Sequence, residues 1–384
     1  MNHIHCKYLV LFIGLALYSG SLFCQVEGES DVTSIFLKKP EGLKTDSLPP
    51  EISIISPRVD SSFNANISAT HIYLVGRLTD ESGISSLRIN NEIIPTDENG
   101  YFQKKYDLPD GLNVFELNAS DTLSNSCTRL LSLVNIQPDE TMTNYDGLFT
   151  EGENHGLLIG VNDYSDPAIF DLDKPFDDAT LLYSVLIGNY MFEPDNVTLL
   201  KNPTRADIIK ELDRLSYTLG PGDNLVIFYA GHGSWDREKE TGYWLPADAD
   251  KLSSVNWIRN STIQDFVDDI NSRHTLLITD ACFAGQIFKS RGLDTDAPVA
   301  IKKLYSMTSR KAMTSGNMEE VPDRSVFLKF LLKRLLENDK KYMPASELFS
   351  SFREAVLNNS PNVPQYGVIQ NTGDEGGEFI FIKR

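Results

Sequence analysis

Hydrophobic and polar residues alternate differently in the two halves of the chain. Between residues 50 and 136, short runs of β-branched and apolar residues are separated by turn-forming pairs such as Asn99-Gly100 and Asp110-Gly111. The spacing is not helical, so the pattern predicts a small antiparallel β-sandwich. The predicted strands are 51–56, 71–78, 84–90, 101–108, 112–120 and 128–136.

From residue 154 to residue 384, nearly continuous apolar runs alternate with segments of helical spacing. Such runs are typical of parallel strands buried on both faces, so this half predicts an α/β fold whose mostly parallel sheet carries helices on both faces. Thr204, three residues before Asp207, is predicted to cap one helix. The predicted strands are 155–161, 196–200, 223–230 and 274–280, and the predicted helices are 175–188, 204–217 and 261–270.

The remaining segments follow neither pattern. Residues 8–23 are apolar and follow a lysine, which is typical of a secretory signal, so we predict that residues 1–24 form one. A retained membrane anchor is the alternative. Residues 25–49 are predicted to be a polar linker, and residues 137–153 an acidic linker without Lys or Arg. An exported protein is therefore expected, located in the periplasm, at the cell surface or outside the cell.

The composition narrows the range of partners. A formal charge of −19 over 384 residues makes nucleic acid and anionic membranes poor partners. Two of the four cysteines leave with the predicted signal, and the other two, Cys127 and Cys282, lie in different predicted domains. No disulfide framework is expected. An exported protein that keeps an unpaired thiol either buries it or uses it.

Two of the predicted strands end in residues that carry chemistry. His232 follows strand 223–230 in the segment FYAGHGS, and Cys282 follows strand 274–280 in the segment DACFAG. Ligands of parallel sheets bind at the carboxyl ends of the strands, so both residues are expected at one edge of the sheet. An imidazole can take the proton of a thiol and create a nucleophilic thiolate. The backbone N–H groups of Gly233 and Cys282 are expected to stabilise the oxyanion of a tetrahedral intermediate.

Residues 155–384 resemble the caspase-like cysteine peptidases of clan CD, nearest to the bacterial and metacaspase-type members. The resemblance rests on HGLLIGVNDYSD, PFDDA, GDNLVIFYAGHG, YWLPADA, LLITDACFAG and DEGGEFIF. It implies a caspase-like α/β fold and peptide-bond hydrolysis through a thioester acyl-enzyme. It also implies that Cys282 is the nucleophile and His232 the general base or proton donor, with no obligatory third residue. Residues 50–136 resemble a bacterial immunoglobulin-like domain through GRLTDESGISSLRINN, DENGYF and LPDGLNVFELNASD, which implies a fold and no chemistry.

The resemblance also implies which bond is cut. In metacaspases, one Asp two residues before the nucleophile and another after the first strand line a pocket for Arg or Lys, and Asp280 and Asp178 match these positions. Two carboxylates in a concave site suit a guanidinium or ammonium group. Cleavage after Arg or Lys is therefore expected, with self-cleavage after Lys289 or Arg291.

Phe283 and Ala284 depart from the His-Ser that commonly follows the metacaspase nucleophile. No cofactor is expected to be required; calcium, which metacaspases often need, is left open and no site is assigned to it, because the chain lacks an EF-hand ladder of acidic residues. The expected partners are polypeptide substrates, together with a surface or protein bound by the sandwich, and a monomer is expected. Two alternatives remain open. One is a catalytically silent caspase-like scaffold with a binding module, and the other is a related peptidase or transpeptidase with a different P1 preference.

Overall fold

The computed structural model describes residues 46–67, 69–136, 152–281, 288–289, 298–316 and 325–384, except for the side chains at 288–289 and 298–300. The predicted signal and most of the two predicted linkers lie outside the described residues. Residues 46–384 form one compact unit. Among the helices described, none is both long enough and apolar enough to cross a membrane.

Eight strands in the first part of this unit form two β-sheets around one core. They are β1 (Glu51–Ser56), β2 (Asn64–Ile67), β3 (His71–Thr79), β4 (Ile84–Ile89), β5 (Glu92–Ile94), β6 (Tyr101–Asp107), β7 (Gly111–Asp121) and β8 (Ser126–Asn135). One sheet has the order β1-β3-β6 and the other β2-β8-β7-β4-β5. Leu74 and Phe102 from the first sheet and Leu117 and Leu131 from the second are buried in the same cluster. The predicted sandwich is confirmed, but β2 runs parallel to β8, so it is not wholly antiparallel.

The sandwich also contains a cysteine that was expected to be unpaired. Cys127 is a free, half-buried thiol whose Sγ donates to the carbonyl oxygen of Pro50 at 3.0 Å. Burial raises the pKa of this thiol. A thiol with a raised pKa is a poor nucleophile, so Cys127 has a packing role.

The second part of the unit is built on a seven-stranded sheet with the order β10-β9-β11-β15-β17-β19-β16. Its strands are β9 (Asn154–Gly160), β10 (Val197–Lys201), β11 (Asn224–Ala230), β15 (His274–Asp280), β16 (Phe288–Lys289), β17 (Ser309–Thr314) and β19 (Gln365–Ile369). Strands β10, β9, β11, β15 and β17 are parallel, whereas β19 is antiparallel to β17 and β16 is antiparallel to β19. The mostly parallel sheet expected from the apolar runs is confirmed.

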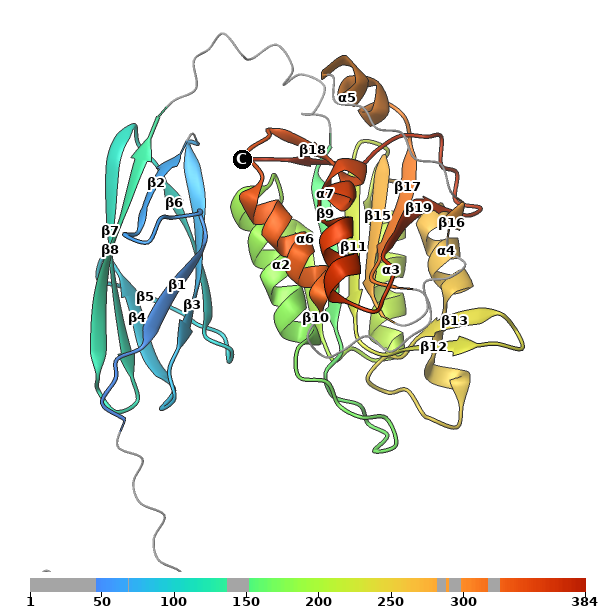
Figure 1. Ribbon diagram of the computed structural model, residues 1–384, viewed down its shortest axis with the longest axis horizontal. Coiled ribbons are helices and arrows are strands. Elements are labelled where there is room, and N and C mark those ends of the chain that lie inside the picture. The colour runs from blue at the N-terminus through green and yellow to red at the C-terminus, as the bar shows by residue number, and fades with distance from the viewer. Residues whose placement is uncertain (1–45, 68, 137–151, 282–287, 290–297, 317–324) are drawn as a thin grey trace, which may run out of the picture. The chain divides into compact units, whose positions relative to one another are not determined.

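Helices cover both faces of this sheet (Figure 1). One face packs against α2 (Pro175–Asn189), α6 (Val326–Glu337) and α7 (Ala345–Asn359), and the other against α3 (Arg205–Thr218) and α4 (Asn260–Asp269). Thr204 and Asp207 form the predicted capping box of α3. The smaller elements are η2 (Pro194–Asn196), β12 (Gly233–Asp236), β13 (Thr241–Trp244), η3 (Ser254–Asn256), β14 (Ile258–Arg259), α5 (Pro298–Tyr305), β18 (Tyr342–Pro344) and β20 (Ile380–Ile382).

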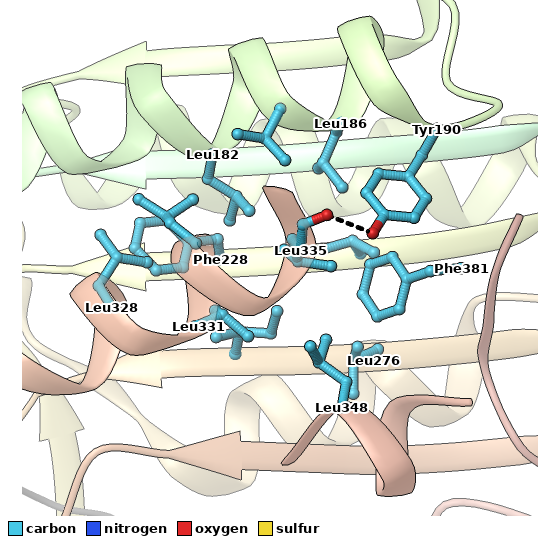
Figure 2. Packing of buried hydrophobic residues seen from close by; sticks show 14 of the residues in the cluster. Leu182, Leu186, Tyr190, Phe228, Leu276, Leu328, Leu331, Leu335, Leu348 and Phe381 are labelled. Atoms are coloured by element: carbon cyan, nitrogen blue, oxygen red, sulfur yellow. Dashed lines mark hydrogen bonds between the residues drawn. The ribbon is translucent and has the colours of Figure 1, made fainter. Parts of the chain in front are cut away.

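Alternation along the central strands explains the two helical layers. In β11, Val226 and Phe228 pack with α2, α6 and α7, whereas Leu225 and Ile227 pack with α3 and α4. Positions 225–228 are therefore all apolar, which is why the sequence shows a continuous run. Figure 2 shows Phe228 between the leucines of α2 and α6.

The core of this layer includes a buried polar contact at Tyr190. The hydroxyl of Tyr190, at the end of α2, donates to the carbonyl oxygen of Leu335 in α6 at 2.8 Å (Figure 2). Strands β1 and β3 of the sandwich also contact α2. The Tyr73 hydroxyl of β3 donates to Glu193 at 2.7 Å, just beyond the end of that helix.

Candidate active site

The two strands that precede the predicted catalytic residues end side by side. Ala230, the last residue of β11, is directly paired with Asp280, the last residue of β15. Because the strands are parallel, the segments that follow β11 and β15 leave the sheet at the same edge, as expected. His232 follows two residues after Ala230. Cys282, two residues after Asp280, lies outside the described residues.

The backbone of His232 is held by two tyrosines. Gly231 has a φ of 153°, and a Cβ at this position would lie 3.1 Å from the Tyr164 hydroxyl, so the turn into His232 favours glycine. The His232 N–H donates to the Tyr164 hydroxyl at 2.8 Å, and the Tyr229 hydroxyl donates to the His232 carbonyl at 2.8 Å. The imidazole lies against the Tyr164 ring with their centroids 5.1 Å apart. These contacts fix the position of the ring at the sheet edge.

A backbone carbonyl fixes the tautomer of His232. Its Nε2 lies 2.8 Å from the carbonyl oxygen of Phe170. A carbonyl can only accept, so Nε2 carries the hydrogen, and in the neutral ring Nδ1 is left as the proton acceptor. The Phe170 side chain is 83% exposed, so this residue contributes its backbone alone. Sequence reasoning missed this contact because every residue carries a carbonyl.

Gly233, the predicted oxyanion donor, follows His232 directly. It is half-buried and begins β12, where it pairs with Trp244 of β13. The other predicted donor is the N–H of Cys282, which lies outside the described residues. The oxyanion role of both groups therefore stays a prediction.

Asp280 is a buried carboxyl whose charge is not balanced by a nearby cation in the described part of the chain. It is 5% exposed and shares the face of β15 that carries Leu276 and Ile278, the face covered by α2 and α6. Within the described ranges, its Oδ1 has no hydrogen-bond partner. Burial raises the pKa of Asp280 and outweighs the hydroxyls of Ser325 and Ser315, which lower it. Buried polar atoms are usually hydrogen-bonded, so this carboxyl oxygen requires an explanation.

Asp178 reaches the same side of the sheet from helix α2. It is half-buried in the first turn of the helix, where its N–H donates to the Lys174 carbonyl at 2.9 Å. The first turn approaches the sheet closely because β9 ends in glycine: a Cβ on Gly160 would lie 2.4 Å from the Phe176 Cα. Gly160 therefore sets how near to the sheet edge Asp178 can lie.

Ser325 connects the two carboxyls. Its hydroxyl accepts from the Leu328 N–H at 2.9 Å, which caps α6 and leaves its O–H to donate to Asp280. Ser325 and Asp178 line the same cavity. The structure thus brings Asp178 and Asp280 to one region on one face of the sheet. Ser315 and Ser325 were not identified from the sequence, since an isolated serine carries no signal.

The predicted self-cleavage positions are described only in part. Lys289 is the last residue of β16 and pairs with Val368 of β19. Arg291 lies outside the described residues. The backbone of Lys289 is therefore part of the sheet, and its side chain is not described.

Within the described ranges, only one group of acidic residues is close enough to share a metal ion, and it lies in the sandwich. Oxygens of Asp46, Asp80 and Asp121 lie within 4.8 Å of one another. Asp121 already accepts hydrogen bonds from Leu123 and Asn125. We assign no metal to this group, and a calcium requirement stays an open prediction.

Comparisons with known proteins agree with this geometry. Residues 153–373 match the model of the Peptidase C14 family, the caspase domain. Metacaspase-4 of Arabidopsis thaliana is 28% identical over 196 residues, which cover 47% of this chain and 43% of that protein. Metacaspase-1 of Eremothecium gossypii is 24% identical over 233 residues, which cover 48% of this chain and 50% of that protein. The chain thus spans about half the length of these relatives.

Among solved structures, caspase-1 from Spodoptera frugiperda is similar to this chain at 13% identity, with a TM-score of 0.43. The similarity covers 61% of this chain and 93% of that chain. The match to the caspase family extends over more than half of the 384 residues and includes the strand ends described above. The chain belongs to the caspase-domain family of peptidases, and its second part has the caspase-like fold.

Proposed function

We propose that this protein is an exported cysteine endopeptidase that cleaves polypeptides after Arg or Lys. The observation that carries the proposal is the buried carboxyl of Asp280, whose Oδ1 has no partner among the described residues. It lies two residues before Cys282 and on the side of the sheet to which Asp178 belongs. A basic P1 side chain supplies a cation to this carboxyl, for which no cationic partner is found among the described residues.

In the proposed mechanism, Nδ1 of His232 takes the proton of the Cys282 thiol. The thiolate attacks the scissile carbonyl carbon, and the carbonyl oxygen becomes an oxyanion that accepts from the N–H groups of Gly233 and Cys282. Collapse of this intermediate breaks the C–N bond, and the imidazolium gives its proton to the leaving amine. A thioester remains. Water then attacks the thioester, with His232 as general base, and releases the acid and the thiol.

The Phe170 carbonyl has a defined part in this mechanism. It keeps the hydrogen on Nε2, so the acceptor nitrogen of the neutral ring is the one available to the thiol. When His232 becomes an imidazolium, Nε2 still donates to this carbonyl and part of the new charge is stabilised. The Cys–His dyad thus has a backbone partner and needs no third side chain.

The preference for a basic P1 residue follows from desolvation. Arg or Lys in the pocket forms charge-assisted hydrogen bonds with Asp280 and Asp178, whereas a neutral side chain leaves Asp280 uncompensated. An acidic P1 side chain adds like charge and is excluded. Breaking such a pair by removing one partner costs about 3–5 kcal/mol, so the choice of basic over neutral P1 is strong.

Export and oligomeric state are part of the same proposal. The apolar run at residues 8–23 supports export through a secretory signal. The outer edge of β19 is paired with β16, which leaves less of that edge for a second chain and favours a monomer. The sandwich is proposed to bind a surface or a protein partner.

Residues 25–384 are to be incubated with fluorogenic peptides that differ only in P1, which is Arg, Lys, Asn or Asp, with and without calcium. We expect turnover of the Arg and Lys peptides, which Cys282→Ala and His232→Ala abolish. Turnover confined to the Asn or Asp peptide would contradict the P1 assignment. Absence of turnover in every condition would favour the catalytically silent scaffold.

A further inference from the structure

A cavity of 680 Å³ adjoins the proposed P1 pocket. Asp178 and Ser325 form the part of its wall nearest to Asp280, since the Ser325 hydroxyl faces that carboxyl. Helices α2 and α6 provide one side, and β1 with the turn after it provides the other. A polypeptide bound with its P1 side chain at Asp280 therefore passes next to this cavity.

Most of the charged groups that line the cavity are cationic. Arg58, Lys174, Lys329 and Lys333 contribute four cations, against the two carboxylates of Asp178 and Glu337. The whole protein has a net charge of −19, so this local excess of positive charge is opposite to that of the molecule. A cationic recess in an acidic protein concentrates anionic groups.

Two of these four cations have no carboxylate partner within the described residues. The Lys174 Nζ lies 3.3 Å from Asp177 Oδ2, and the Lys333 Nζ lies 3.8 Å from Glu337 Oε1. Arg58 and Lys329 make no such ion pair in the described ranges, and both are exposed. Lys329 and Lys333 are one turn apart on α6, so they point to the same side of the helix. The cavity thus has two cationic groups available for an anion.

Apolar side chains form the rest of the lining. Ile54 and Val59 come from the sandwich, and Leu181 and Leu332 come from the two helices. An aliphatic wall excludes water and strengthens the attraction between a bound carboxylate and the cations around it. The cavity combines cations with a low-dielectric wall, which suits a short acidic side chain.

We propose that this cavity is a second substrate subsite, which binds an Asp or Glu side chain of the polypeptide within a few residues of the basic P1 residue. This inference rests on the proposed function and narrows its substrate class to sequences that place acidic residues beside Arg or Lys. Arg58 comes from the turn after β1, so the sandwich contributes directly to substrate selection. The two neighbouring sites have opposite charge, and they select opposite charges in the substrate.

The test uses peptides with Arg at P1 that carry either Glu, Gln or Lys at one flanking position, from P4 to P3′. For the best position we expect kcat/KM for the Glu peptide to exceed that for the Gln peptide roughly 2- to 5-fold, mainly through KM, as for exposed charge pairs. The preference decreases at 0.5 M salt, because salt screens exposed charges. In Arg58→Glu/Lys329→Glu the preference reverses, so that the Lys peptide is cleaved better than the Glu peptide.

The matched control is Lys210→Glu, which makes the same charge change on the exposed side of α3, on the opposite face of the sheet. This variant keeps the wild-type preference for Glu. The ratio between peptides is measured within each variant, so a general loss of active enzyme cancels. If Arg-P1 peptides are cleaved but the Glu-to-Gln ratio is near one, or is unchanged in the double variant, the subsite is wrong and the proposed function stands. If no basic-P1 peptide is cleaved, the proposed function fails and the subsite fails with it.

Discussion

Replacing Asp280 by Asn separates the contribution of this residue to function from its effect on stability. The carboxyl is 5% exposed, and its Oδ1 has no partner in the described part of the chain. Burial raises its pKa, so the folded protein holds the Asp280 proton more tightly than the unfolded chain does. Its favourable contribution to stability is therefore complete below the unfolded pKa and is lost as the pH rises through the folded pKa.

The expected magnitudes follow from this burial. A buried group whose hydrogen bonding or charge is not satisfied costs about 1–3 kcal/mol, and Asn cannot ionise. Asp280→Asn should therefore raise the free energy of unfolding by about 1–3 kcal/mol at pH 8, and by less at pH 5. Each kcal/mol corresponds to about 2–4 °C in Tm for a domain of this size. The same change removes the ion pair with a basic P1 residue, which costs about 3 kcal/mol, or roughly 10²-fold in kcat/KM.

Thermal unfolding at pH 5 and pH 8, together with kcat/KM for an Arg peptide, measures both effects in one variant. Asp213→Asn is the matched control, because it removes one carboxylate from the exposed surface of α3. We expect the control to change neither quantity. An Asp280→Asn protein that is less stable than the wild type at pH 8 would refute the account of an uncompensated charge. A loss of Arg cleavage below about threefold would refute its role in P1 recognition.

Four further predictions follow from individual contacts. First, kcat/KM for Arg peptides should rise with pH through the raised pKa of Asp280, because only the ionised carboxyl pairs with P1, and this limb should be absent from the pH profile of Asp280→Asn. Second, Gly160→Ala should lower stability by about 1–3 kcal/mol in thermal unfolding, because the new Cβ meets the Phe176 Cα. It should also displace Asp178 and so raise KM for Arg peptides, and an unchanged KM would count against this placement. Third, Phe170→Ala should leave kcat within about twofold, since only the carbonyl acts on His232, and a loss above tenfold would show that the exposed ring takes part. Fourth, Arg291→Ala should abolish a self-processing band near residue 290 on a denaturing gel, whereas Lys289→Ala should not, because the Lys289 backbone is paired with β19. A band that survives in the double variant Lys289→Ala/Arg291→Ala would rule out self-cleavage at these residues.

Several long elements were predictable because their periodicity matches their burial, whereas helices α6 and α7 were not predicted. Strand β1 has the predicted bounds, β15 begins and ends at the predicted residues, and α2 begins at the predicted Pro175. The short strands β2 and β5 escaped prediction because three or four residues show no period. The other boundaries of the predicted elements differ from the structure by at most two residues, which is usual at the ends of helices and strands.

Strand β17 was missed for a different reason. Its sequence, SRKAMT, begins with polar residues, but all six residues are buried. The Arg310 guanidinium donates to the carbonyls of Val267, Ile270 and Ser272, at the end of α4 and in the turn that follows it. These acceptors compensate its burial, which a hydrophobicity pattern cannot anticipate because the acceptors lie about forty residues away in the chain.

The geometry of the candidate site depends on strand parity and on the helix that covers each face. In β15, Leu276, Ile278 and Asp280 point to one side, and a shift of one residue would turn Asp280 toward α3 and α4. The alternation of side chains along the strand can be counted in the sequence, so the sequence could predict that Asp280 shares a face with Leu276 and Ile278. It does not say that α2, which carries Asp178, covers that same face, because the side chosen by each helix depends on the order of the strands in the sheet. That order, β9-β11-β15, places α2 against β9 and β11, next to β15, and so brings to one face of the sheet two carboxyls that are about one hundred residues apart in the chain.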